Sequence, residues 1–423
     1  MTAPALAPVN MHMHSHFSFN ADGLAPAQLA EEAVRRGLYA AAICDFDVLD
    51  GLEEFFGAGD AHAFRVAVGM ETRVFFPEYA DREINSPGEP GVYYFMGMGF
   101  GCVPEEGTLA ARTLETLREG AAQRNRDLTS RINAAFPEIA IDYDRDVIPL
   151  TPSGNATERH IVRAYIEKVR RISNGDAAAQ SGTWARALGL DVGKIGALLE
   201  NSVALQNAVR SKLMKAGGVG YVQPGPSTFP PLEDVAGAIL DAGAIPMATW
   251  LNGLSAGESD IAAQLDCLRA KGIAALNIVP DRNWNVSDPD ERETKVARLH
   301  EVVEIAGRME LPLNVGTELN SFGQPFVDDF EAAPMRPLWP AFFHGANVMI
   351  GQSRLARYAK FSYCGPEAEA EFGAGATTRN EFFMQAGTLE PPNARTRERL
   401  EDMGPDRAFA AIRDSARAGR WIL

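Results

Sequence analysis

The feature that most constrains the fold of this chain is a repeated order of apolar runs and helix-like segments. The runs lie at residues 39–44 (YAAAIC), 65–70, 92–98, 244–250, 274–280 and 311–319, and helical spacing of apolar residues separates most of them, as in LEDVAGAILDAG at 232–243. A short continuous apolar run suits a strand that is buried on both faces of a parallel sheet. Strands that alternate with helices predict an α/β fold.

This alternation divides the chain into four parts. It covers residues 10–107, stops, and resumes over residues 216–333. The stretch 108–215 has long helical patterns rich in Ala, Leu, Arg and Glu, broken by Pro137, Pro149 and Pro152. Residues 334–423 show no such alternation and end in an amphipathic helix, for which packing on the barrel or on a second subunit are both open. We therefore expect a barrel in two halves, a helical insertion and a C-terminal extension.

Composition and charge exclude several classes of function. Lys and Arg number 40 and Asp and Glu 56, which gives a net charge of −16, so the surface repels nucleic acid. No apolar stretch is long enough to cross a membrane, the N-terminus does not resemble a signal peptide, and the four cysteines form no CxxC pair. We expect a cytoplasmic protein without disulfides that acts on a small anionic molecule, because bound cations can dominate the field of a pocket.

Three histidines near the N-terminus indicate a metal site. His12, His14 and His16 alternate along a predicted strand and would point to the same face. Imidazole is a good ligand for zinc, iron and manganese. The alternative is a tag remnant or a polar strand face. We predict a divalent metal, zinc, manganese or iron, as one or two ions.

Four short motifs resemble the PHP (polymerase and histidinol phosphatase) domain family. His14-Ser15-His16, residues 20–23 (NADG), residues 44–47 (CDFD) and residues 69–71 (GME) follow one another at about the spacing of the family's HxH, SDG, TDHD and GxE motifs. The resemblance implies a distorted (βα)7 TIM-like barrel with metals at the carboxyl ends of its strands. It also implies a phosphoesterase that hydrolyses a small phosphorylated metabolite with metal-activated water.

Individual residues can be matched to the motifs of the family. The resemblance assigns His14 and His16 to the HxH pair, Asp22 to the loop aspartate and Glu71 to a carboxylate that can bridge two metals. Residues 316–320 (GTELN) resemble a terminal GSDxH motif, which makes Glu318 a further ligand. The alternatives are that Asp22 is only a turn residue and Glu71 only a surface charge.

A second resemblance lies in the predicted insertion. Arg159-His160-Ile161 is similar to a stretch of phosphoesterase members in which the histidine reaches the metals and the arginine meets phosphate. A solvated helix would show the same residues, so both interpretations are open.

The chain also departs from the family pattern. Phe46, Tyr94, Thr249 and Asn320 stand where the family has histidines, and phenylalanine cannot bind a metal. A full trinuclear site is therefore not expected. The predicted site comprises His12, His14, His16, Glu71 and Glu318 as metal ligands, Asp45, Asp22 and His160 as acid or base, and Arg159, Arg282, Trp250, Asn283 and Asn320 as substrate-binding residues.

Two other functions compete with the phosphoesterase interpretation. One is a mononuclear hydrolase or lyase acting on a non-phosphate substrate, which the loss of four histidines would suit. The other is a non-catalytic PHP-like binding protein that kept the barrel but lost turnover. Metal content separates the second from both enzymes, and a panel of phosphoesters separates the two enzymes. Whether the chain forms a homo-oligomer is open.

Overall fold

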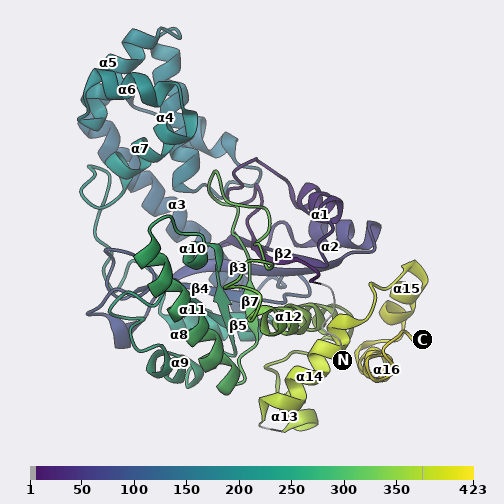
Figure 1. Cartoon of the computed structure of the whole chain (residues 1–423). Coiled ribbons are helices and arrows are strands. Elements are labelled where there is room, and N and C mark those ends of the chain that lie inside the picture. Colours follow the sequence, from purple (N-terminus) through teal and green to yellow (C-terminus); the bar gives the residue numbers. More distant parts are fainter. Residues whose placement is uncertain (1–5, 374) are drawn as a thin grey trace. The chain divides into compact units, whose positions relative to one another are not determined.

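The structure is a computed structural model that describes residues 6–373 and 375–423 (Figure 1). The chain divides into two compact units, and each is described by itself. Unit 1 contains residues 1–15, 20–114 and 226–423, and unit 2 contains residues 16–19 and 115–225. The domain boundaries expected from the sequence remain a prediction. Of the described helices, none is both long and apolar enough to span a bilayer.

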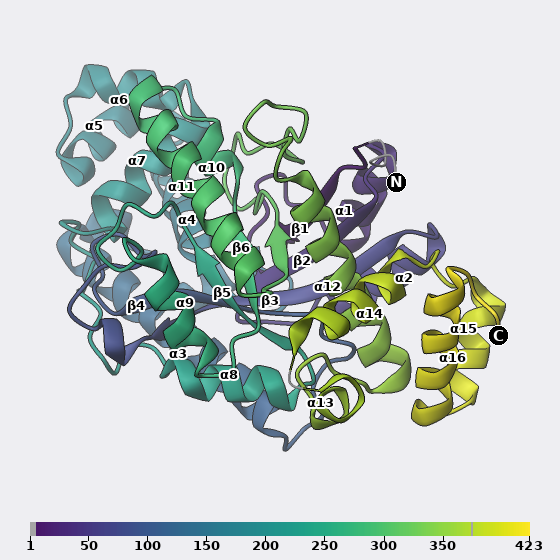
Figure 2. The same cartoon turned by 60° about the horizontal axis from the view of Figure 1, so that its bottom comes forward.

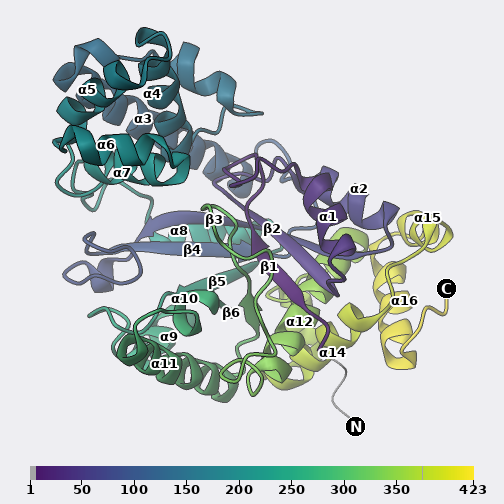
Figure 3. The ribbon, with the colours of Figure 1, turned by 45° about the horizontal axis from the view of Figure 1, so that its top comes forward.

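Unit 1 is built on a seven-stranded sheet in the order β1-β2-β3-β4-β5-β6-β7. Figure 3 shows its strands inside the unit, with α9 and α11 outside them. The strands are β1 (Val9–Met13), β2 (Ala40–Phe46), β3 (Arg65–Phe75), β4 (Val92–Met98), β5 (Ile245–Trp250), β6 (Ala275–Ile278) and β7 (Leu313–Val315). The connecting helices are α1 (Pro26–Arg35), α2 (Leu52–Ala61), α8 (Leu232–Asp241), α9 (Ile261–Arg269), α10 (Asp281–Trp284) and α11 (Pro289–Arg308).

Pairing is parallel throughout this sheet except at β4. This strand runs antiparallel to both β3 and β5, and a loop with one short 3-10 helix, Pro77–Tyr79, joins it to β3 instead of an α-helix. The six other strands therefore end at the same edge of the barrel, where the amino end of β4 joins them. The expectation of an α/β fold with a distorted seven-stranded barrel is confirmed.

Backbone hydrogen bonds between the first and last strand regions close the barrel. The Glu318 N–H donates to the His12 carbonyl, and the His14 N–H donates to the Glu318 carbonyl, both at 2.7 Å. Met13 and Glu318 form a parallel bridge through these bonds. The side chain of Asn314 adds a third link, since its Nδ2 donates to the Met11 carbonyl at 2.9 Å.

Unit 2 is helical. A core of buried side chains that includes Tyr165 and Trp184 holds its helices together. The Tyr165 hydroxyl donates to Asn133 Oδ1 at 2.9 Å, which satisfies its polar end inside this core. The helices are α3 (Leu109–Ala135, which begins in unit 1), α4 (Glu158–Ile172), α5 (Ala177–Leu188), α6 (Val192–Leu199) and α7 (Ser202–Met214), with short 3-10 helices at Pro137–Ile139 and Ile148–Leu150 and a π-helix at Tyr143–Val147.

The C-terminal extension covers one end of the barrel, the end opposite the carboxyl ends of the parallel strands. Gln352 on α12 donates to the carbonyls of Gly99 at 3.2 Å and Gly243 at 2.7 Å. The Tyr39 hydroxyl donates to Asn347, also on α12, at 2.8 Å. These partners lie just after β4 and just before β5 and β2. Figure 2 shows α14 beside α12. The helices are α12 (Trp339–Ala359), α13 (Pro366–Phe372), α14 (Ala376–Thr388), α15 (Ala394–Asp402) and α16 (Pro405–Ala418).

This cover depends on a close approach at Gly345. A Cβ atom placed there would overlap the backbone of Leu313 at the start of β7. We expect Gly345→Ala to lower the free energy of unfolding by about 1–3 kcal/mol or more, because a rigid backbone must move to make room. Gly307→Ala is the matched control, since Gly307 lies in helix α11 with no atom near its Cβ position. Thermal denaturation measures both. Equal stability of the two variants would contradict the packing described.

Candidate metal centre

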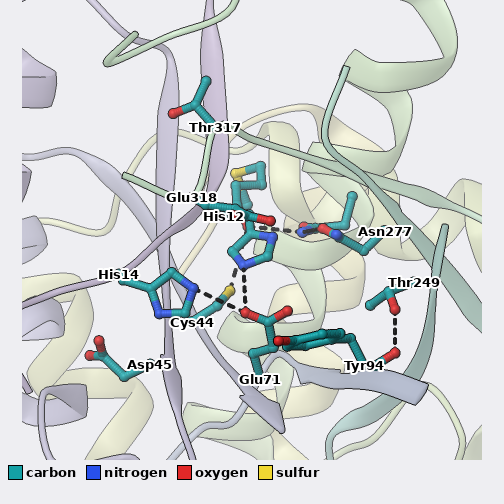
Figure 4. A network of polar contacts seen from close by, with 12 residues as sticks. His12, His14, Cys44, Asp45, Glu71, Tyr94, Thr249, Asn277, Thr317 and Glu318 are labelled. Atoms are coloured by element: carbon teal, nitrogen blue, oxygen red, sulfur yellow. Dashed lines mark hydrogen bonds and ion pairs between the residues drawn. The ribbon is translucent and has the colours of Figure 1, made fainter. Parts of the chain in front are cut away.

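His12, His14 and Glu71 come together in unit 1. Their ligand atoms all lie within 4.8 Å of one another, and all three side chains are buried. Figure 4 shows them pointing toward a common point, with Asp45 on the other side of His14. His12 and His14 come from β1 and the residue that follows it, and Glu71 comes from β3. Among the described residues this is the group of His, Cys, Asp and Glu side chains arranged to hold a metal ion.

Glu71 and His14 form a hydrogen-bonded pair. His14 Nε2 lies 3.0 Å from Glu71 Oε2. Burial alone would lower the pKa of His14, but Glu71 and the charges of Asp45 and Glu318 outweigh it and raise that pKa. Burial opposes ionisation of Glu71 as well, yet both histidines hold its pKa well below the ordinary value. A metal ion would take the place of the shared proton, because imidazole binds metals in its neutral form.

His12 supplies the test of whether the group fits a metal. Both of its ring nitrogens are buried and make no hydrogen bond. Its Nε2 lies 3.5 Å from Glu71 Oε2, which is an electrostatic contact and too long for a good hydrogen bond. A buried polar atom without a partner costs free energy. Two imidazoles and a carboxylate are also a donor set that zinc, manganese and iron accept, so the residues fit a divalent ion.

The expectation that three histidines share one strand face is wrong for His16. Strand β1 ends at Met13, and residues 16–18 form a turn. The period of two therefore no longer applies beyond His14. His16 belongs to unit 2 and is not part of the group with Glu71. The pair with HxH spacing that the structure brings to Glu71 is His12 and His14.

Asp45 lies at the end of β2 in a fixed orientation. Its Oδ1 accepts from the Ser15 N–H at 2.7 Å, and its Oδ2 accepts from the Ser15 hydroxyl at 2.6 Å. The carboxylate is buried. Phe46, the next residue, stacks on the His14 ring with centroids 4.5 Å apart. The phenylalanine that stands in place of a family histidine thus fixes the plane of a remaining one.

Glu318 and Arg282 form an ion pair in the same unit. Glu318 is buried, and both it and Leu319 have a positive φ, 66° and 55°. Such a conformation costs about 1–2 kcal/mol for each non-glycine residue, so the barrel-closing hydrogen bonds must hold it. The predicted ligand Glu318 is therefore placed beside His12 and His14 by its backbone and is paired with arginine through its side chain.

The other substrate-binding candidates of unit 1 have different surroundings. Trp250 is buried at the end of β5, and its indole N–H has no hydrogen-bond partner. Asn283 is buried and donates to the carbonyls of Leu251 and Val279 at 3.1 and 3.2 Å, which gives it a structural role in the loops. Asn320 is half-buried, and Asp22, which was predicted as an acid or base, is exposed.

His160 and Arg159 belong to unit 2. The Thr157 N–H donates to His160 Nδ1 at 3.1 Å, so the ring proton lies on Nε2. Burial and the charge of Arg163 lower the pKa of His160 to about 4. Arg159 donates to Asn207 Oδ1 at 2.8 Å, and burial and Arg210 lower its pKa to about 10. The roles of both residues remain predictions.

Two residues near the strand ends were missed from the sequence. Arg73 lies two residues after Glu71 on β3, makes an ion pair with Glu89 at 3.4 Å and stacks over Phe229. The period of two along β3 would have placed it on the same face as Glu71. Asp328 has no sequence signal. It is buried, and its Oδ1 accepts from the Trp284 indole N–H at 2.8 Å, which fixes helix α10 and with it Arg282.

The comparisons with known proteins concern the family and the fold of the chain. Residues 10–148 match the family model of the PHP domain, so the resemblance is confirmed over those residues. A comparison with curated proteins gave no match. The fold is similar to that of an amidohydrolase from Chromobacterium violaceum whose structure holds sulfate and no metal, with 20% identity, a TM-score of 0.52, and coverage of 80% of this chain and 97% of that one. A putative metal-dependent phosphoesterase from Bifidobacterium adolescentis is 18% identical, with a TM-score of 0.49 and the same coverage.

The buried carboxyl group of Asp328 predicts a dependence of the unfolding free energy on pH. Burial raises its pKa to about 7, against an ordinary value of 3.8, although Trp284 opposes the shift. Because the folded state binds this proton more tightly, the contribution of Asp328 to stability is fully present at low pH and is lost as the pH rises from about 4 to about 7. The slope reaches about 1.4 kcal/mol per pH unit between pH 4 and 7.

Asp328→Asn keeps an acceptor for Trp284 and removes the titration, so we expect its unfolding free energy to fall less steeply over this range. Urea unfolding at several pH values compares it with the wild type. Asp402→Asn, at an exposed position of helix α15, is the control and should keep the wild-type slope. Identical slopes for all three proteins would contradict the raised pKa.

Proposed function

We propose that this chain is a metal-dependent hydrolase that holds a divalent ion with His12, His14 and Glu71, since residues 10–148 match the family model of the PHP domain. The observation that carries the proposal is the buried group itself, in which His12 has two ring nitrogens without hydrogen bonds. It lies toward the carboxyl ends of the parallel strands, which is where barrel enzymes place their active sites. The α12 helix covers the opposite end.

We further propose that the substrate is a small phosphoester. Sulfate, which the structure of the Chromobacterium amidohydrolase holds, has the tetrahedral shape of a phosphate group. The side chain of Arg282 is 41% exposed while it pairs with Glu318, and a guanidinium has five N–H donors, so an anionic oxygen can also accept from it. These features make phosphate esters the first substrates to test.

Each residue of the proposed site has a distinct task. A bound divalent ion would supply Lewis-acid chemistry, lowering the pKa of a coordinated water and polarising an oxygen of the substrate. Asp45 is oriented by Ser15, which donates to both of its oxygens, and a carboxylate in this position can accept a proton from water. Phe46 fixes the His14 ring and excludes water from one of its faces. Arg282 would bind the negative charge of the substrate.

Metal content and hydrolysis of a substrate panel test the proposal on protein without an affinity tag. We expect stoichiometric zinc, manganese or iron in the wild type. His12→Ala and His14→Ala should lose the metal and at least about 100-fold of the hydrolysis rate. His16→Ala is the matched control, since His16 is not part of the group, and it should keep its metal.

The panel should contain phosphomonoesters, phosphodiesters, amides and carboxylic esters. Hydrolysis of phosphoesters supports the whole proposal. Bound metal with cleavage of another bond only would refute the phosphate substrate and leave the metal-dependent hydrolase. A wild type that takes up no metal, even after incubation with all three ions, would refute the proposal.

A further inference from the structure

Carboxylates surround His14. Three of them, Asp45, Glu71 and Glu318, are buried and act electrostatically on this ring. Ser15 donates to Asp45, His14 pairs with Glu71, and the guanidinium of Arg282 pairs with Glu318. Buried carboxylates need compensation by hydrogen bonds or positive charge, so a guanidinium or a metal ion beside them stabilises the group.

Arg282 is held in place rather than lying free on the surface. It is the second residue of α10, a four-residue helix that follows β6. The next residue, Asn283, is buried and bonded to the loop after β5, and Trp284 is bonded to the buried Asp328. Two anchors on adjacent residues therefore fix the backbone from which the guanidinium reaches Glu318.

Glu318 provides the carboxylate with which Arg282 forms its ion pair. Its side chain is 7% exposed, and its backbone is bonded to His12 and His14 on either side of Met13. This position would suit a carboxylate that binds a metal next to the histidines. A guanidinium paired with that carboxylate supplies a positive charge at the same point, without an ion.

We propose that the Arg282 guanidinium takes the place of a second metal ion, so that the site binds one divalent ion and uses the arginine as its second positive charge. This inference rests on the proposed metal site. It explains how a strained, buried Glu318 is retained without being a ligand of the first ion. The second charge is then part of the chain and stays when the ion is removed.

Metal stoichiometry tests this inference directly. Metal-free full-length protein is titrated with Mn²⁺, the bound metal is counted, and electron paramagnetic resonance distinguishes a single Mn²⁺ from two coupled ions. We expect one ion per chain in the wild type. Arg282→Gln frees Glu318 and should bind a second ion, raising the count from one toward two with a spin-coupled signal.

Three further variants separate charge from other effects. Arg282→Lys keeps the positive charge and should bind one ion. The double variant Arg282→Gln, Glu318→Gln removes the freed carboxylate and should return to one. Arg336→Gln breaks an exposed pair with Glu331 in the same unit and should also bind one. Thermal denaturation checks that each variant is folded.

The outcomes distinguish this inference from the proposed function. Two ions in the wild type, or one ion in folded Arg282→Gln, would overturn the role of Arg282 and leave the metal site standing. A Glu318→Gln variant that binds no ion would do the same, because Glu318 would then be a ligand of the first ion. No bound Mn²⁺ in any protein, with none of the other metals either, would refute the proposed function itself.

Discussion

The backbone pairing of Glu318 with His12 and His14 is the constraint on which the rest of the site depends. Two hydrogen bonds of 2.7 Å join the end of the first strand to the loop after the last one. They close the barrel and hold Glu318 in a left-handed conformation that an isolated chain would avoid. The bond that completes the fold thus also sets a carboxylate beside the two histidines, so stability and site geometry have one origin.

Burial gives this arrangement its chemical character. Inside the barrel the carboxylates lose water and are compensated by specific partners: the histidines for Glu71, Ser15 for Asp45 and Arg282 for Glu318. His12, by contrast, keeps two buried ring nitrogens without hydrogen bonds. Next to carboxylates that each have a partner, this ring is oriented for a ligand that imidazole can bind. The C-terminal helices close the other end and leave the strand ends as the functional face.

Much of the fold followed from local patterns in the sequence. Apolar runs such as 39–44 became buried parallel strands, because their composition suits a sheet covered on both faces. The antiparallel direction of β4 was not predictable, since its run of residues resembles that of its neighbours and pairing direction is set by long-range contacts. The packing of residues 334–423 on the barrel was not predictable either. It depends on close contacts such as that of Gly345 with the backbone of Leu313, and the spacing of apolar residues does not reveal such contacts.

The candidate site was predicted less completely. Glu71 stood out because it follows an apolar run, and His12 and His14 because they alternate. The error at His16 arose because the point at which β1 ends is set by pairing with Glu318 and not by the alternation itself. The partnership of Arg282 with Glu318 and the buried Asp328 join residues far apart in sequence. Only the folded chain brings such residues together.

Anomalous X-ray diffraction from crystals grown with Mn²⁺ or Zn²⁺ tests the central claim most directly, because it locates the ion without reference to activity. The account predicts one strong peak within bonding distance of the His12 and His14 rings and the Glu71 carboxylate, with Arg282 still paired to Glu318. A peak at His16 but none at these three residues, or no peak in crystals of metal-treated protein, would contradict it.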